Sequence, residues 1–144
     1  MLACSLLVGL LYILPPLIIK YHLEKNGGVF ILNFETYRDE IFYLTRAREV
    51  YDGHFPPTDP YLDSGLKNVQ NPLPSLMMAA FIWMSDGDPT SAYLLAQFVF
   101  AQISFLVFYW LGNKLVKQPN WALLFALMGV LTPIAIRIFN FNGA

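Results

Sequence analysis

The sequence predicts an all-α integral membrane protein with about three transmembrane helices, an amphipathic surface helix and a short re-entrant or interfacial helix. Hydrophobic residues make up 56% of the 144 residues and charged residues only 13%, whereas soluble domains carry about 25% charged residues. Long uncharged runs flank a single segment that holds most of the charges. The net charge of −1 offers no basic surface, so we expect no nucleic-acid partner.

The first uncharged run covers residues 1–19 and is the first predicted transmembrane helix. Its 18 residues from position 2 onward contain no charged side chain, and a helix of that length rises about 27 Å, close to the thickness of a bilayer core. A signal peptide is the alternative, but no small-residue cleavage site follows and the run leads into Lys20. Pro15 and Pro16 should kink this helix or end it early. Cys4, the single cysteine, is expected to be a small packing residue.

Residues 20–71 form a predicted external loop. This segment contains six of the 9 basic and eight of the 10 acidic residues, so it must lie in water or at the membrane surface. Within it, apolar residues recur at helical spacing over 35–52 with charges between them, which predicts an amphipathic helix. Asn33 is the expected N-cap of this helix and Gly53 its expected left-handed terminator.

The next apolar run, residues 73–84 within the predicted segment 72–86, is too short to cross a membrane upright. A helix of 12 residues rises only about 18 Å, which predicts a re-entrant or interfacial helix. Asn71 followed by Pro72 is typical of a helix start.

Two longer runs, residues 89–111 and 120–141, are the second and third predicted transmembrane helices. Asp88 followed by proline starts the first of them, and Pro133 interrupts the second. Between them, Lys114 and Lys117 lie in a short turn that has no acidic residue.

The basic residues favour one arrangement in the membrane, because short cytoplasmic loops are enriched in Lys and Arg. If residues 73–84 do not cross, the lysine turn lies on the side opposite the acidic loop 20–71. We therefore expect a protein of the plasma (inner) membrane, with the N-terminus and the lysine turn in the cytoplasm and the acidic loop outside.

The amphipathic helix carries the first group of residues that could perform chemistry. At about 100° per residue, Asp39, Tyr43 and Arg46 share one face, with Glu40 beside them. A carboxylate there could accept a proton from a hydroxyl group or bind a divalent cation such as Mg²⁺ or Mn²⁺. The alternative is a solvated face laced with ion pairs, which is the usual behaviour of charge runs on helices.

Two further sets of residues leave their interpretation open. Arg137 lies near the end of the last predicted helix, where a charge can be functional or can simply reach water through its long side chain. An oxygen-rich group in the loop could bind a hard cation, although its spacing fits no EF-hand. This group is Asp52, His54, Asp59 and Asp63.

The order of these features resembles a known family. The surface helix reads Asp39-Glu40-x-x-Tyr43-x-x-x-Ala47 and continues to Gly53; a short proline-initiated helix and a long spanning helix that ends at Gly112 follow. This order resembles the N-terminal part of the GT-C superfamily of membrane glycosyltransferases, in particular its protein mannosyltransferase and aminoarabinose transferase branch.

The resemblance implies a function for the acidic pair. Asp39, with Glu40, would be the catalytic acid of the first external loop, and it would activate the acceptor nucleophile or hold a metal that does so. Tyr43, Arg46 and Arg137 would contact the substrate. The implied donor is a sugar on a polyprenyl phosphate, which membrane lipid would deliver to the external face.

The same resemblance implies that the chain is the N-terminal part of a longer protein. Members of the superfamily have many more transmembrane helices, so we expect the 144 residues to be inactive alone and to pack against further membrane helices or subunits. Two other classes remain: a non-enzymatic membrane subunit or scaffold that docks through its loop, and, with weaker support, a transporter fragment. Transporters place ionisable groups at mid-membrane, and the first two predicted spans have none.

Overall fold

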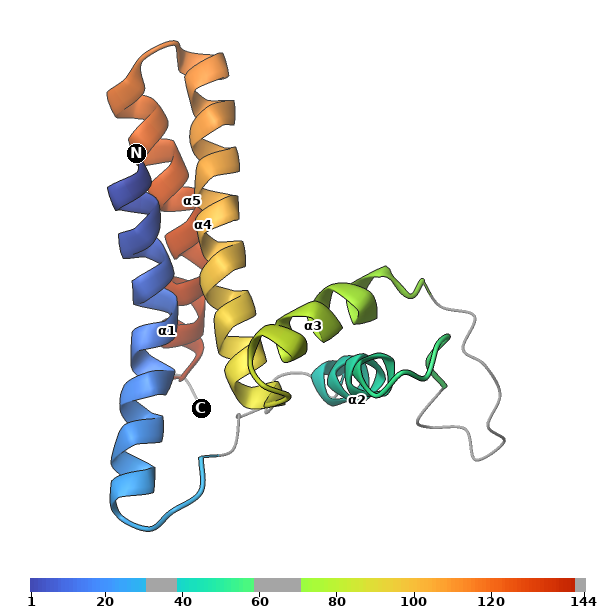
Figure 1. Cartoon of the computed structure of the whole chain (residues 1–144). Coiled ribbons are helices and arrows are strands. Elements are labelled where there is room, and N and C mark those ends of the chain that lie inside the picture. The colour runs from blue at the N-terminus through green and yellow to red at the C-terminus, as the bar shows by residue number, and fades with distance from the viewer. Residues whose placement is uncertain (31–38, 59–70, 142–144) are drawn as a thin grey trace. The chain divides into compact units, whose positions relative to one another are not determined.

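A computed structural model describes residues 1–30, 39–58 and 71–141, with the backbone alone described at 39–42 and 133–141. Within these ranges the chain forms five helices and no strand (Figure 1). The all-α prediction is therefore confirmed for the described residues. The chain divides into two compact units. We call them the bundle unit (Met1–Leu17 and Gln97–Ala144) and the loop unit (Ile18–Ala96).

Helix α1 (Leu2–Lys25) is longer than the first predicted span, because it continues beyond the apolar run into a charged end. It also runs through Pro15 and Pro16, so the early end that these prolines predicted does not occur. Each proline removes one intrahelical hydrogen bond, but several turns of helix on either side remain bonded. Prolines are tolerated in this way within long apolar helices.

Helix α1 and helix α4 (Pro89–Val116) are long and apolar enough to cross a membrane. Helix α5 (Pro119–Phe141) runs through Pro133. The part of α5 with described side chains, Pro119–Thr132, is apolar but shorter than a span. Two of the about three predicted spans therefore have a matching helix, and the third stays a prediction.

The core of the bundle unit consists of small and aromatic side chains from α1, α4 and α5, which lie side by side in Figure 1. Phe105 of α4 is fully buried in a cluster that also contains Val8 of α1 and Ala126 of α5. A hydrogen bond also links α1 to α5, because the hydroxyl of Tyr12 donates to the carbonyl oxygen of Val130 at 2.6 Å. Such bonds and close packing hold helices together where the surroundings are apolar.

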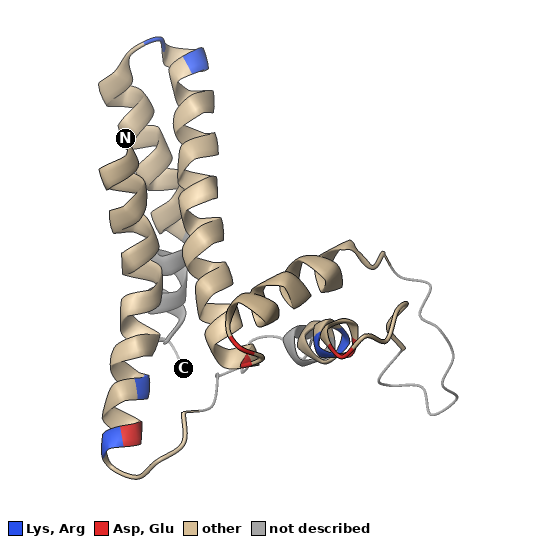
Figure 2. Cartoon of the chain, viewed as in Figure 1, with Lys and Arg blue, Asp and Glu red and all other residues tan. Residues whose placement is uncertain are grey.

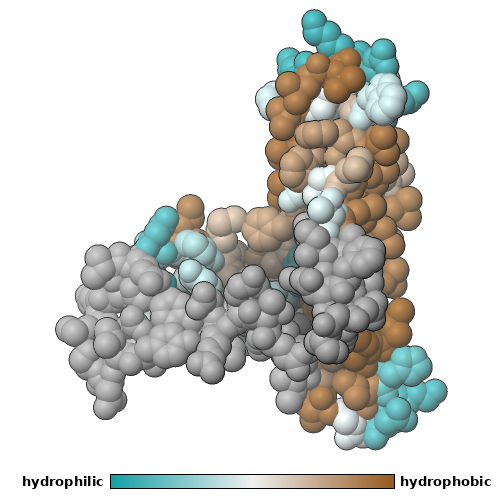
Figure 3. Space-filling view, turned by 180° about the vertical axis from the view of Figure 1, so that it is seen from behind, coloured by the Kyte–Doolittle hydropathy of each residue, from teal (hydrophilic) through white to brown (hydrophobic). Residues whose placement is uncertain are grey.

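Charged residues gather at the ends of the long helices. In Figure 2 the described charges of α1 lie in its last turns, and those near the turn between α4 and α5 are Lys114 and Lys117. Figure 3 shows apolar side chains over the sides of the long helices and hydrophilic residues at their ends. Many of the apolar side chains of α1 are exposed, including Leu7 at 61% and Ile18 at 53%.

In the loop unit, helix α2 (Asp39–Tyr51) packs against helix α3 (Leu73–Met84) (Figure 1). A small core of Ala47, Ile82 and Ala92 joins these two helices to the start of α4. The predicted amphipathic helix and the short helix predicted after the loop are therefore both helical, and the re-entrant or interfacial position of the short one stays a prediction. The predicted start of the amphipathic helix, residue 35, and its expected cap, Asn33, lie outside the described residues.

The predicted helix boundaries in this unit rest on specific local contacts. Gly53 ends α2 with a φ of 90°, a left-handed conformation that glycine adopts without a steric penalty. The N–H of His54 then donates to the carbonyl of Glu49 at 2.9 Å, as in a helix terminator of this kind. At the start of α3, the side-chain oxygen of Asn71 accepts a hydrogen bond of 3.0 Å from the N–H of Leu73.

Candidate functional site

Asp39 and Glu40 are the first residues of α2 that the structure describes. Residues 31–38 before them lie outside the described part of the chain, so α2 is described only from the acidic pair onward. The side chains of these two residues lie outside the described part of the chain.

Tyr43 and Arg46, the other two predicted residues of α2, differ sharply in exposure. The Tyr43 side chain is 46% exposed, whereas Arg46 is only 1% exposed. The two residues share a face by helical spacing, but only the phenol reaches the surface. The guanidinium of Arg46 lies inside the loop unit. It therefore belongs neither to a solvated face nor to a surface groove shared with Tyr43.

Arg48 joins α2 to the turn between α3 and α4. Its Nη1 donates a hydrogen bond of 2.7 Å to the carbonyl oxygen of Gly87, and its Nε lies 3.1 Å from a carboxylate oxygen of Asp52. Its guanidinium also lies 4.9 Å from the ring centre of Tyr51. Sequence reasoning missed this residue, and the available signal was the Arg–Asp spacing of four residues, which brings the two side chains together on a helix.

The carboxylate of Glu49 is occupied by the segment that follows α2. It accepts hydrogen bonds from the backbone N–H of Thr58 at 2.7 Å and from the Thr58 hydroxyl at 2.6 Å. The contact folds the chain back on the helix after Gly53. Glu49 therefore has a structural role, as Arg48 does, and the described charges in the second half of α2 are engaged within the chain.

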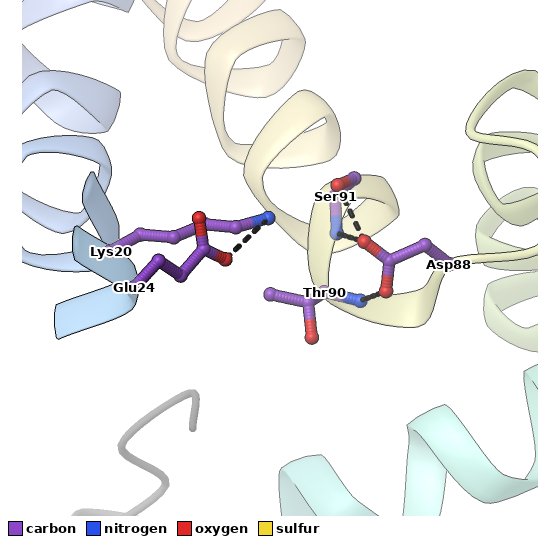
Figure 4. A network of polar contacts seen from close by, with 5 residues as sticks. All are labelled: Lys20, Glu24, Asp88, Thr90 and Ser91. Carbon is purple, nitrogen blue, oxygen red and sulfur yellow. Dashed lines mark hydrogen bonds and ion pairs between the residues drawn. The ribbon is translucent and has the colours of Figure 1, made fainter. Parts of the chain in front are cut away.

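Asp88 is the N-cap of α4, as the sequence predicted (Figure 4). One carboxylate oxygen accepts the N–H of Thr90 at 3.0 Å. The other accepts the N–H of Ser91 at 3.1 Å and the Ser91 hydroxyl at 2.6 Å. Such a cap satisfies helix N–H groups that have no partner within the helix.

The cap also determines the protonation of this carboxyl group. Burial raises the pKa of Asp88, but the hydrogen bonds from Ser91 and Thr90, together with the charge of Lys20, lower it by more. The net pKa lies below the ordinary value of 3.8, so the carboxylate is charged at neutral pH. Both of its oxygens take part in the cap, so the described role of Asp88 is structural.

A pocket of about 290 Å³ lies in the loop unit between the end of α1 and the start of α4. Lys20 and Glu24 of α1 form a long ion pair there, with 3.9 Å between nitrogen and oxygen, and in Figure 4 the Lys20 side chain extends toward the start of α4. The pocket carries one basic and two acidic groups. Its lining residues are Lys20, Glu24, Gly28, Val29, Phe30, Asp88 and Thr90.

The remaining predicted site residues are described only in part. Arg137 belongs to α5, in the bundle unit, and only its backbone is described. Of the oxygen-rich loop group, Asp52 pairs with Arg48, while Asp59 and Asp63 lie outside the described residues. Among the residues with described side chains, no three of the types His, Cys, Asp and Glu come together as a metal site would require.

Comparison with known proteins adds no family. No family model, no curated protein and no solved structure matches the chain.

Proposed function

We propose that the chain is the N-terminal membrane module of a glycosyltransferase that takes a sugar from a polyprenyl-phosphate donor and moves it to an acceptor at the external membrane face. In this proposal α1, α4 and α5 all cross the membrane, and α2 and α3 stay on the external side. The length and apolar character of α1 and α4 support the embedding, as do their exposed apolar side chains.

The observation that carries the proposal is the pairing of α2 with α3. Helix α2, which carries Asp39 and Glu40, packs against an uncharged helix of 12 residues, and that short helix leads directly into the long apolar α4. An acidic pair is thus attached to apolar segments on both sides along the chain. A reaction between a lipid-borne donor and a water-side acceptor needs this combination of a carboxylate and a membrane boundary.

In the proposed reaction, the carboxylate of Asp39 accepts the proton of the acceptor's nucleophilic group as that group attacks the sugar. The bond from the sugar to the polyprenyl phosphate then breaks, and the phosphate leaves with its lipid. Glu40 lies next to this carboxylate in the chain, and the half-exposed Tyr43 phenol can hydrogen-bond to the substrate. For the buried Arg46 we propose a supporting role inside the loop unit, and for Arg137 a contact with the donor phosphate.

We write this scheme with Asp39 as the base and derive no step through a metal. A Mg²⁺ or Mn²⁺ ion held by Asp39 is the other form of the proposal. Further ligands would have to come from other residues before Asp39 could hold an ion.

The decisive experiment replaces the proposed base in the complete product of the gene. We expect Asp39→Asn to lower the rate of sugar transfer by a factor of about 100 or more, because general acid–base catalysis contributes about 10²–10⁴. The assay would supply a panel of polyprenyl-phosphate sugars to membranes that contain the protein. Full activity of Asp39→Asn would remove Asp39 from the reaction.

Asp86→Asn is the matched control for that experiment. Asp86 lies in the turn between α3 and α4 with a φ of 51°, a conformation that asparagine also tolerates. It makes the same charge change at an exposed residue outside α2, so transfer should be unaffected. If both variants lose activity equally, the loss reflects charge or folding and not the role of Asp39.

The second candidate function is a membrane subunit or scaffold that docks through its loop. The internal contacts of Arg48 and Glu49 favour it, because they show that charges of α2 can serve structure alone. A scaffold predicts that no sugar on any polyprenyl phosphate is consumed and that the Asp39→Asn variant still assembles with its partners.

A further inference from the structure

Helix α3 has no charged side chain and has two different faces. One face is buried in the loop unit, where Ser75, Ala79 and Ile82 are 1%, 8% and 0% exposed. The other face is apolar and exposed along the whole length of the helix. Its members, spaced by three and four residues so that they lie along one side, are Leu73, Leu76, Met77, Ala80, Trp83 and Met84.

The exposure of this apolar face is large for its residue types. Trp83 is 77% exposed, Met84 62% and Leu73 55%. Contiguous apolar patches on a protein surface mark sites that contact another molecule or a membrane. The partner within the chain, α2, already occupies the opposite side through the contact of Ala47 with Ile82, so α2 does not cover the exposed face.

The connection to α4 determines what can cover this face. Only Ser85 to Asp88 separate α3 from α4, and four residues reach at most about 14 Å. These residues are folded back, since the N–H of Gly87 donates to the carbonyl of Ile82 at 2.9 Å. The end of α3 is therefore held close to the point where the long apolar helix begins.

The turn between α3 and α4 indicates where the start of α4 lies relative to the membrane surface. It contains the exposed Asp86 and the charged cap Asp88, which need water, and Pro89 begins the uncharged stretch of α4. A charged turn at the beginning of an apolar helix of this length corresponds to the boundary between water and membrane. Tryptophan is enriched at this boundary, and Trp83 lies two residues before the turn.

We propose that the exposed apolar face of α3 inserts into the acyl-chain boundary of the leaflet in which α4 begins, with α2 on the opposite, water-facing side of α3. An amphipathic helix lying in the interface buries its apolar face about 5–10 Å into the headgroup and acyl boundary. The occupant is thus bilayer lipid. The inference rests on the proposed membrane crossing of α4 but not on the transfer reaction.

The test uses the tryptophans as depth probes. The chain has three, Trp83, Trp110 and Trp121, so replacing the last two with phenylalanine leaves Trp83 as the single fluorophore. The protein is reconstituted in phosphatidylcholine vesicles whose lipids carry bromine at a shallow, middle or deep carbon of the acyl chain. We expect the shallow bromines to quench Trp83 most strongly and iodide in the water to quench it weakly.

Two controls frame this measurement. A variant with Trp110 alone reports whether α4 lies in lipid, and it should be quenched by bromolipid. A tryptophan-free chain with His54→Trp, at an exposed residue just after α2, should respond to iodide and not to bromolipid. If Trp110 is quenched by bromolipid and Trp83 is not, the inference on α3 is overturned while the membrane crossing of α4 survives.

The remaining outcomes of the quenching experiment also support or overturn the proposed position of α3. Strongest quenching of Trp83 by the deepest bromines would mean that α3 enters the bilayer centre and would overturn the inference. If the tryptophan replacements disturb folding, a spin label at Met77→Cys in a Cys4→Ser chain reads the same face. Faster collision with oxygen than with a water-soluble nickel chelate supports insertion, and the reverse order overturns it.

Discussion

Asp88 shows how one residue connects the apolar and charged parts of the chain. Its carboxylate caps α4 through three hydrogen bonds, at the position where the charged turn gives way to an uncharged helix. The helix dipole favours a negative charge at this end. The residue thus contributes to the stability of α4 whatever reaction the protein performs.

We predict that Asp88→Ala lowers the free energy of unfolding by about 1 kcal/mol at neutral pH, as loss of an N-cap usually does. Asp88→Asn should cost much less, because asparagine also caps helices. Unfolding in mixed detergent micelles, followed by circular dichroism, measures both. Equal losses for the two variants would show that the charge matters and the cap does not.

The same variants give a pH dependence with a definite sign. The pKa of Asp88 in the folded chain lies below 3.8, so its contribution to stability is fully present above that pH and is lost as the pH falls through the lowered pKa. The difference between the natural chain and Asp88→Ala should therefore shrink only in strong acid. A difference that already disappears near pH 6 would contradict the assignment.

Some residue roles could be predicted from the sequence and others could not. Gly53 and Asp88 were predictable because a left-handed terminator and an N-cap act on their own few neighbours. The bond from Arg48 to Gly87 depends on the turn after α3, about 40 residues away along the chain. The burial of Arg46 is likewise a property of the folded unit and not of α2 alone. Helical spacing alone cannot tell which charged residue faces a partner helix, so α2 resembled a solvated face.

At the scale of elements, the long helices illustrate the strength and the limit of hydropathy. Uncharged runs located α1, α4 and α5, but the helices extend beyond the apolar boundaries, as α1 does through Lys25 and α4 through Val116. The predicted ends were placed where charged residues begin. Backbone hydrogen bonding does not depend on charge, so the helices continue past those points. Likewise, Pro15 and Pro16 weaken the helix locally without ending it.

Close packing of α4 and α5 depends on Gly112. A side-chain carbon added there would lie 3.1 Å from the Cα of Ala122 and 3.3 Å from its carbonyl oxygen, contacts that only a backbone shift could relieve. Small residues allow such close approach between helices in membranes. The packing therefore requires glycine at this turn of α4.

We predict that Gly112→Leu lowers the free energy of unfolding of the bundle unit by about 1–3 kcal/mol, the usual cost of overpacking. The matched control is Leu111→Ile on the neighbouring, exposed position, which should change stability by less than about 0.5 kcal/mol. Proteolysis of the turn between α4 and α5 in detergent would follow the separation of the two helices. If Gly112→Leu proves as stable as the control, the two helices do not pack as described.

At the scale of the whole molecule, the proposed function combines a membrane arrangement with a reaction. In the proposed arrangement α1, α4 and α5 cross the membrane, and α2 and α3 stay together on the external side. The proposed reaction comes from the resemblance in feature order, and the position of Asp39 and Glu40 on α2 is consistent with it. The arrangement can be tested without any knowledge of the substrate, and every role proposed for Asp39 depends on it.

The most direct test is to locate two described positions relative to the membrane in intact cells. Single cysteines are placed at His54, after α2, and at Gln118, between α4 and α5, both exposed, in a Cys4→Ser chain, and are labelled with a membrane-impermeant maleimide from outside. If the loop is external and the lysine turn cytoplasmic, His54→Cys is labelled from outside and Gln118→Cys is labelled only after the cells are opened. If both are labelled from outside, α3 crosses the membrane; if only Gln118→Cys is labelled, the loop is cytoplasmic. Either result contradicts an external site at Asp39.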